Sequence, residues 1–357
     1  MFLFVLITWT LFAISQGLSQ PLLPARALHW VLRTSDLAKS LHFYQKILGM
    51  KIFRHEEMTT PCEITCNGHG YNNSWSKTMV GYANTENDGY ALELTYNYGV
   101  RSYPAGAGLQ RIVVRLPHIL YSRVVTGAEE SGYDAHYIDT RIHAGRKAIE
   151  IVGPDRYVYE VVMKENIFRD GILINPIVFV GVRLRIANAA KTVAWYKDML
   201  GMEDVEINDD EEETKSLARL ITQVDQSATH RVGAVLAVKF PNDNIMISFE
   251  SVGARVNSGG HTESGWDGRH AFAMPVERIQ TINARLQEED PLLIIHPLRQ
   301  TSTITEGIVE TILILSDPNG FELCLISHDA FKNAVSFLPT SLPNWKLRKS
   351  LEPHDEL

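Results

Sequence analysis

Two stretches of the chain share one pattern: DLAKSLHFYQKILGMKI from Asp36 to Ile52, and NAAKTVAWYKDMLGMED from Asn188 to Asp204. They align without a gap, which indicates an internal duplication. In each copy an Asp or Asn suited to an N-cap precedes apolar residues that recur on one helical face. A glycine then stands at the C′ position, Gly49 in one copy and Gly201 in the other. The pattern predicts two packed helices in two similar domains. The apolar faces are Leu37, Leu41, Tyr44 and Leu48, and Ala189, Val193, Tyr196 and Leu200.

Alternating stretches around these helices predict strands. They include RALHWVLR, WSKTMVGY, YALELTYNY, RIVVRL and KAIEIVG, and two tight Pro-containing turns, from Gly153 and from Asp317, each feed another strand. The order is a strand, a helix and then several strands, repeated about four times. We therefore expect an α+β fold with open sheets curled into cups, in two domains at 27–165 and 176–330.

The composition excludes several classes of protein. The formal net charge is −8, and there is no basic stripe of the kind that binds nucleic acid. Three cysteines are too few for a disulfide scaffold and have no zinc-finger spacing. Cys62 and Cys66 either bridge each other in an oxidising compartment or are two ordinary thiols.

The sequences at the two ends predict that the protein is located in the endoplasmic reticulum. The apolar run from Phe2 to Ile14 suits a signal-peptide core and is too short for a stable membrane span. We expect a signal peptide at 1–17, a linker at 18–26 and a flexible tail at 331–357. The tail ends in HDEL, the sequence that the ER retention receptor binds. The sequon at Asn72 to Ser74 agrees with a lumenal location. If the leader is not genuine, the cytoplasm or the mitochondrion is the alternative.

Three ionisable residues lie within mainly apolar strands. His29 shares a strand face with Val31 and Arg33, whereas Glu93 and Glu160 lie on two other strands. Such groups are costly to bury unless they are paired or bound to a metal. One histidine and two carboxylates suit a divalent ion such as Zn, Ni, Co or Mn. Spacing alone does not show that the three meet, and each also fits a surface-facing strand position.

The stretches LHWVLRTSDLAKSLHFYQKILGMKIFR and LELTYNYGV resemble glyoxalase I of the vicinal-oxygen-chelate superfamily. The resemblance covers Ala27 to about Phe331. It implies tandem domains of the glyoxalase/bleomycin-resistance type, built from four βαβββ modules that pair into cups, each cup holding one metal. It places His29, Glu93 and Glu160 at metal positions, with Glu160 also the catalytic base.

The resemblance also marks departures from the family pattern. The third metal position is Arg111, and an arginine is always cationic and cannot ligate a metal. Arg111 either bridges Glu93 and Glu160 in the metal's place or turns outward to bind an anionic substrate. Arg33 and Asn97 match substrate-binding positions for glutathione, whereas a third such position is Ala107.

In the second domain the four matching positions are Gly181, Glu250, Arg269 and Cys324. Only Glu250 and Cys324 of these can ligate a metal, so we expect a remnant site formed by Glu250, Arg269 and Cys324 without a catalytic metal. The next residue, His270, should face the opposite side of its strand. Glu322 shares a face with Cys324 and could substitute as a ligand.

Two functions follow from the resemblance. The first is a metal-dependent isomerisation of the hemithioacetal of methylglyoxal and glutathione, with glutathione as co-substrate. The second is a non-catalytic cup with a degenerate metal site that binds a metabolite or a protein. In either case we expect the chain to bind a small molecule or a protein partner, and to be a monomer or a homodimer.

Overall fold

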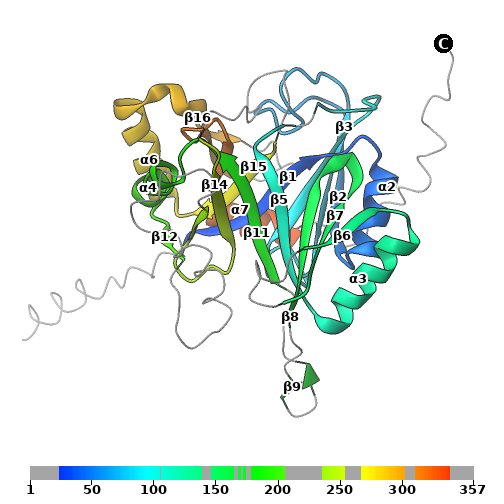
Figure 1. Cartoon of the computed structure of the whole chain (residues 1–357). Helices are drawn as coiled ribbons and strands as arrows, with labels where there is room; N and C mark the ends of the chain where they lie inside the picture. The colour runs from blue at the N-terminus through cyan, green and yellow to red at the C-terminus, as the bar shows by residue number, and fades with distance from the viewer. Residues whose placement is uncertain are drawn as a thin grey trace, which may run out of the picture.

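The computed structural model describes residues 24–104, 106–138, 146–164, 168–169, 172–173, 178–205, 235–253, 267–301 and 310–337. Two eight-stranded mixed sheets run through the molecule, with helices at its periphery (Figure 1). The expected α+β class is therefore confirmed. Among the described residues, no helix is long and apolar enough to cross a membrane.

Four modules of similar order build the two sheets. The first module contains β1 (Arg26–Arg33), α2 (Leu37–His42), the π-helical η1 (Phe43–Ile47), β2 (Lys51–Met58), β3 (Trp75–Gly81) and β4 (Ala91–Asn97). The second contains β5 (Leu109–Pro117), α3 (His118–Glu130), β6 (Asp134–Tyr137), β7 (Ala148–Val152), η3 (Pro154–Arg156) and β8 (Val158–Lys164).

The second half of the chain repeats this order. The third module contains β11 (Val178–Ile186), α4 (Ala189–Leu200), β12 (Glu203–Asp204), β13 (Val235–Lys239) and β14 (Met246–Ser251). The fourth contains β15 (Arg269–Met274), α6 (Val276–Glu289), η5 (Pro291–Leu293), β16 (Ile294–Thr301), β17 (Glu310–Ser316) and β18 (Glu322–Ser327). The short strands β9 (Phe168–Arg169) and β10 (Ile172–Leu173) pair between the halves, and α7 (His328–Phe337) follows β18. The expected fourfold repeat is confirmed.

The modules pair across the two halves of the chain. One sheet has the order β16-β17-β18-β15-β1-β4-β3-β2, and the other has the order β12-β13-β14-β11-β5-β8-β7-β6. Antiparallel pairs β1–β15 and β5–β11 form the two seams. We call the concave side of the first sheet the first cup and that of the second sheet the second cup. The expected boundaries at 27–165 and 176–330 thus separate modules in sequence, but each sheet contains strands from both halves.

The repeated helices begin and end where the sequence predicts. Asp36 and Asn188 each accept a hydrogen bond from the backbone N–H three residues on, at 2.9 and 3.0 Å. Gly49 and Gly201 have φ values of 72° and 60°, the left-handed conformation that ends a helix at low cost only with glycine. The predicted apolar faces pack into the core, where Tyr44 is 2% exposed.

One continuous core lies on the helix-covered faces of both sheets, and two smaller apolar clusters lie elsewhere. Ile112 and Val114 of β5 join the large core, whereas Val113 between them faces the second cup. This alternation follows from the two-residue period of a strand.

The two predicted ends lie largely outside the described residues. The expected signal peptide at 1–17 and the HDEL sequence are among the residues that the structure does not describe. The flexible tail expected from 331 is wrong at its start, because α7 continues to Phe337 and Phe331 packs into the first cup. The apolar side chain of Phe331 gives the segment a packed face.

Candidate functional site

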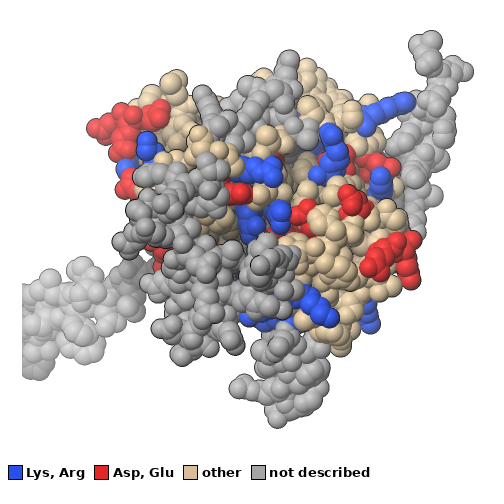
Figure 2. Space-filling model, in the orientation of Figure 1, with Lys and Arg blue, Asp and Glu red and all other residues tan. Residues whose placement is uncertain are grey.

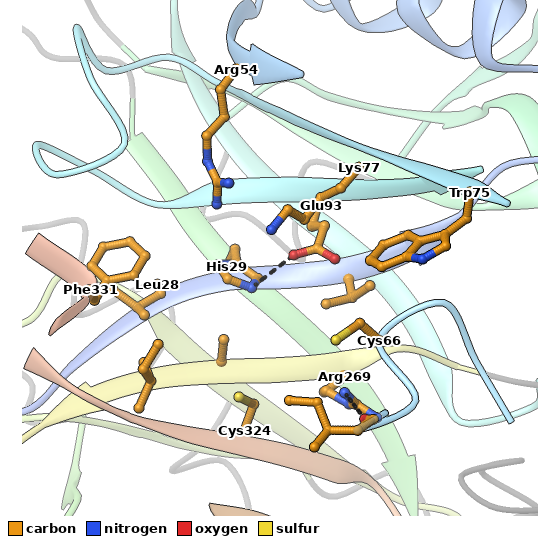
Figure 3. Close-up of a pocket in the computed structure, with 14 residues that line it drawn as sticks. Leu28, His29, Arg54, Cys66, Trp75, Lys77, Glu93, Arg269, Cys324 and Phe331 are labelled. Atoms are coloured by element: carbon orange, nitrogen blue, oxygen red, sulfur yellow. Dashed lines mark hydrogen bonds and ion pairs between the residues drawn. The ribbon is translucent and has the colours of Figure 1, made fainter. Parts of the chain in front are cut away.

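The first cup contains a cavity with about 610 Å³ of atom-free space, counting its open mouth. Strands β1, β2, β3, β4, β15 and β18 contribute to its lining, together with the loop between β2 and β3 and with α7. Its polar side chains are His29, Glu93, Arg54, Lys77 and Arg269, and Cys66 and Cys324 bring sulfur to the wall (Figure 3). The apolar remainder is Leu28, Val31, Ile64, Trp75, Ala271, Ile326 and Phe331. A mainly apolar lining with a few convergent polar groups is typical of small-molecule sites.

His29 and Glu93 meet in this cavity, with 3.3 Å between Nε2 and Oε2. Parallel pairing of β1 with β4 places Glu93 opposite Val31, two residues along the same strand face from His29. The register of β1 shifts against β15 between Ala27 and His29, and Leu28 as well as His29 lines the cavity. Thus two of the predicted metal positions are brought together.

Three cations surround this pair. Arg54 and Lys77 lie on one side of it, and Arg269 lies on the other (Figure 3). Arg54 donates to both carboxylate oxygens of Glu86, at 2.5 and 3.1 Å. Lys77 is 3.1 Å from Glu56, which also contacts Arg54. The cations therefore line the cavity, whereas the carboxylates that balance them do not.

The titration of His29 and Glu93 reflects this environment. Burial is the main cause that lowers the pKa of His29 well below 6.5, and the positive charges of Arg54, Lys77 and Arg269 lower it further. Burial raises the pKa of Glu93, and the same three cations oppose that rise. The three cations thus oppose protonation of both residues, although burial still raises the pKa of Glu93. The same positive charges would attract an anion placed beside them.

Arg269 occupies the third ligand position of this cup, and several hydrogen bonds hold its side chain in place. Its guanidinium donates to Glu322 at 2.7 Å and to the carbonyl of Ile64 at 3.2 Å. It also donates to the hydroxyl of Thr65 at 3.0 Å. Glu322, expected as a substitute ligand, is instead the ion-pair partner of this arginine. Cys324, at the fourth position, is buried, lies outside the disulfide and lines the cavity.

Glu160 does not join His29 and Glu93, and this corrects the expected three-residue site. It lies on β8 in the second sheet, because the second module pairs with the third and not with the first. There the buried Glu160 carboxylate accepts a hydrogen bond from Arg111 at 2.7 Å and lies 3.5 Å from Arg183. Arg111 also bridges to Glu150 at 2.9 Å. One alternative from the sequence was that Arg111 bridges Glu93 and Glu160. Arg111 does pair with Glu160, but its second partner is Glu150 and not Glu93.

The expected remnant site is divided in the same way. Glu250 lies on β14 and belongs to the second cup, whereas Arg269 and Cys324 belong to the first. At Gly181 a Cβ atom would lie 1.8 Å from the carbonyl oxygen of Met246, so that position admits no side chain. Over β5 and β11, Lys and Arg atoms gather beside acidic ones (Figure 2). His270 faces the core as predicted, with 0% exposure and a 3.1 Å contact to the Tyr90 hydroxyl.

Arg33 and Asn97, expected to bind glutathione, lie beside the first cup and not in its cavity lining. The Arg33 guanidinium packs over the rings of Tyr71 and Tyr103, at 5.1 and 5.8 Å. The amide of Asn97 donates to the Asn67 carbonyl at 2.9 Å and to Tyr103 at 3.2 Å. In this structure both residues hold the loop before β3.

That loop, residues 59–74, forms one wall of the cavity, and we call it the rim loop. Cys62 and Cys66 form a disulfide within it, which resolves the two alternatives left by the sequence. Ile64 and Cys66 face the cavity. Sequence reasoning missed Arg54 and Lys77 as cavity residues, although RHEE and WSKT each show a charged residue within a strand pattern. Because their partners lie on neighbouring strands and loops, no local spacing reveals them.

The residues present do not complete a metal site. Within the part of the chain that the structure describes, no group of three His, Cys, Asp or Glu side chains is placed to hold an ion. In the first cup Arg269 occupies one of the four ligand positions. In the second cup Arg111 and Gly181 occupy two of the four.

Comparison with known proteins agrees with the fold. Residues 26–136 match the model of the Glyoxalase/Bleomycin resistance protein/Dioxygenase superfamily. Residues 221–334 match the C-terminal domain of glyoxalase domain-containing protein 4-like proteins. The two matches fall on the two halves of the duplicated chain.

Individual relatives extend this agreement. Glyoxalase domain-containing protein 4 of Rattus norvegicus is 26% identical, over 88% of this chain and 89% of its own length. A probable lactoylglutathione lyase of Vibrio cholerae is 30% identical, over 40% of this chain and 92% of its own. The crystal structure of glyoxalase I from Zea mays has the same fold, with a TM-score of 0.61 and 17% identity over 93% of this chain and 97% of that one. The chain, with its two vicinal-oxygen-chelate domains, belongs to the Glyoxalase/Bleomycin resistance protein/Dioxygenase superfamily.

Proposed function

We propose that the first cup binds a small anionic metabolite and does so without a catalytic metal. The observation that carries this proposal is the set of three cations, Arg54, Lys77 and Arg269, around His29 and Glu93. A carboxylate or phosphate placed among them would gain charge-assisted hydrogen bonds. The apolar wall at Trp75 and Phe331 would cover the uncharged part of the ligand.

The metal part of the proposal is tested by elemental analysis of the intact protein beside an Arg269→His variant. We expect no stoichiometric Zn, Ni, Co or Mn in the unmutated protein. R269H adds an imidazole beside His29, Glu93 and Cys324, and we expect it to gain about one ion per chain because four such donors suit a divalent metal. Arg269→Lys keeps the positive charge and should stay metal-free. Stoichiometric metal in the unmutated protein would refute the proposal.

The binding part is tested by thermal stability with added lactate, pyruvate or S-lactoylglutathione. A ligand at 100 times its Kd stabilises a protein by about 2.7 kcal/mol. Lys77→Gln removes one lining cation and should weaken binding roughly tenfold, the size of one charge-assisted hydrogen bond. The matched control is Lys39→Gln, on an exposed helix position, which should bind as the unmutated protein does. Equal affinity of the two variants would contradict the assignment of the site.

A second candidate is isomerisation of the hemithioacetal of methylglyoxal and glutathione, with glutathione as co-substrate. It is favoured by the contact of His29 with Glu93 at two family metal positions and by the name of the Vibrio relative. His29 and Glu93 would hold the ion, which would polarise the vicinal oxygens of the substrate. Glu160, the expected base, lies in the other sheet. Metal-dependent isomerase activity that is lost in Glu93→Gln would establish this candidate over the first.

We also propose that the chain resides in the lumen of the endoplasmic reticulum, with its C-terminal HDEL bound by the retention receptor. The Cys62–Cys66 disulfide supports this proposal, because disulfides persist in oxidising compartments. The strands of one chain build both sheets, so a monomer is sufficient for both cups.

A further inference from the structure

The rim loop has two sides, and the cup uses only one of them. Its inner side supplies Ile64 and Cys66 to the cavity wall. The loop is fixed by the Cys62–Cys66 disulfide and by a hydrogen bond of 3.0 Å from the Trp75 indole N–H to the carbonyl of Thr60. These contacts fix the position of the loop, and therefore of its outer side, relative to the cup.

The outer side carries Asn72-Asn73-Ser74, a stretch that neither cup uses. It matches the N-glycosylation pattern Asn-X-Ser/Thr, and the 357-residue sequence contains this pattern once. Asn72 and Ser74 are exposed in irregular backbone directly before β3. The amide of Asn73, in contrast, is partly buried and donates to the carbonyl of Tyr98 at 2.7 Å.

We propose that Asn72 is an N-glycosylation site, an inference that rests on the proposed lumenal location. The glycan donor would be a lipid-linked oligosaccharide pyrophosphate. The Asn72 side-chain nitrogen forms a bond to C1 of the first sugar and loses one proton. The bond from C1 to the pyrophosphate oxygen breaks, and the lipid pyrophosphate leaves with the electron pair. No oxidant or reductant is required.

The structure accommodates such a glycan. Asn72 is exposed and is not part of the cavity lining, so a sugar chain there would extend from the outer side of the rim loop. Asn73 fills the middle position of the sequon, which accepts any residue but proline, and it anchors the segment to Tyr98. The glycan and the ligand of the first cup would therefore bind independently.

The test is expression of the full-length chain in a eukaryotic cell, followed by endoglycosidase treatment and electrophoresis. We expect a single mobility shift that is absent from Asn72→Gln and from Ser74→Ala. Two matched variants should keep the shift: Ser74→Thr preserves the hydroxyl, and Asn73→Gln changes the neighbouring amide but leaves the sequon intact. Loss of the shift in N73Q together with its presence in N72Q would overturn the assignment.

Protease protection of microsomes separates failure of this inference from failure of the location. A protease-protected chain without an endoglycosidase-sensitive shift would overturn the glycan and leave the lumenal location standing. A chain that is digested without detergent would overturn both. Anion binding in N72Q should equal that of the unmutated protein, and a loss of binding would place Asn72 in the cup and contradict the outer position proposed for it.

Discussion

Arg269 shows how one residue shapes both the wall and the charge of the first cup. Its guanidinium spans the distance from Glu322 on β18 to the backbone of the rim loop, so it both balances a buried carboxylate and fixes a wall of the cavity. It also raises the positive potential at His29 and Glu93. A histidine here could ligate a metal, whereas an arginine cannot. The residue therefore favours an anion beside His29 and Glu93.

Asp317 allows a prediction about pH at the same scale. It is fully buried, and burial raises its pKa from 3.8 to about 6, although Asn319, Phe321 and Tyr196 donate hydrogen bonds to it. Because the pKa is higher in the folded state, the carboxyl contributes stability below pH 3.8 that is lost as pH rises through about 6. The free energy of unfolding of Asp317→Asn relative to the unmutated protein should therefore improve by about 3 kcal/mol between acid and neutral pH.

Urea denaturation at pH 4.5 and at pH 7.5 should show about 2 kcal/mol of this difference, because pH 4.5 still lies above 3.8. Asp290→Asn, at an exposed position beyond α6, is the matched control for the same change of side chain at the surface. A pH-independent difference for D317N would contradict the assigned pKa of Asp317.

The rim loop is the element that shapes the first cup, and its disulfide can be tested directly. Closing a loop of this length stabilises a protein by about 2 kcal/mol in the chain-entropy model. We expect the double variant Cys62→Ser, Cys66→Ser to lose about that free energy of unfolding and to bind the anion more weakly, because Cys66 and Ile64 form the cavity wall. Both changes are measured by denaturation and by titration with ligand.

Reduction gives the corresponding control. Dithiothreitol should destabilise the unmutated protein and the variant Cys324→Ala by a similar amount, because Cys324 is outside the disulfide. It should leave the double variant unchanged. A double variant that still responds to the reductant would show that the disulfide is not the bond being broken.

At the level of elements, the sequence predicts the repeated helices and the strand faces but not the pairing of strands. Caps and apolar spacing are local, so Asp36, Asn188 and Gly49 could be read directly. The side-chain alternation of β1 placed His29 and Trp30 on opposite faces for the same reason. Partnership between strands depends on backbone hydrogen bonds that every sequence can form. For this reason the sequence could not show that Glu160 belongs to the other sheet.

The whole molecule is joined at two seams that lie in the middle of its sheets. β1 pairs with β15 in one sheet and β5 with β11 in the other, so each sheet has four strands from each half of the chain. A half-chain alone would expose the backbone edges of β1 and β5, and exposed edges of this kind promote association. The two halves should therefore behave as one folding unit.

A protease site inserted between β10 and β11 tests this behaviour in the otherwise intact protein. After cleavage the two fragments should elute together at the volume of the uncut chain and unfold in a single transition, because two strand ladders and a shared core connect them. Size-exclusion chromatography with light scattering measures the first property, and calorimetry the second. Two separate, monomeric fragments would mean that each half folds alone, and the first cup would then lose Arg269 and with it the anion site.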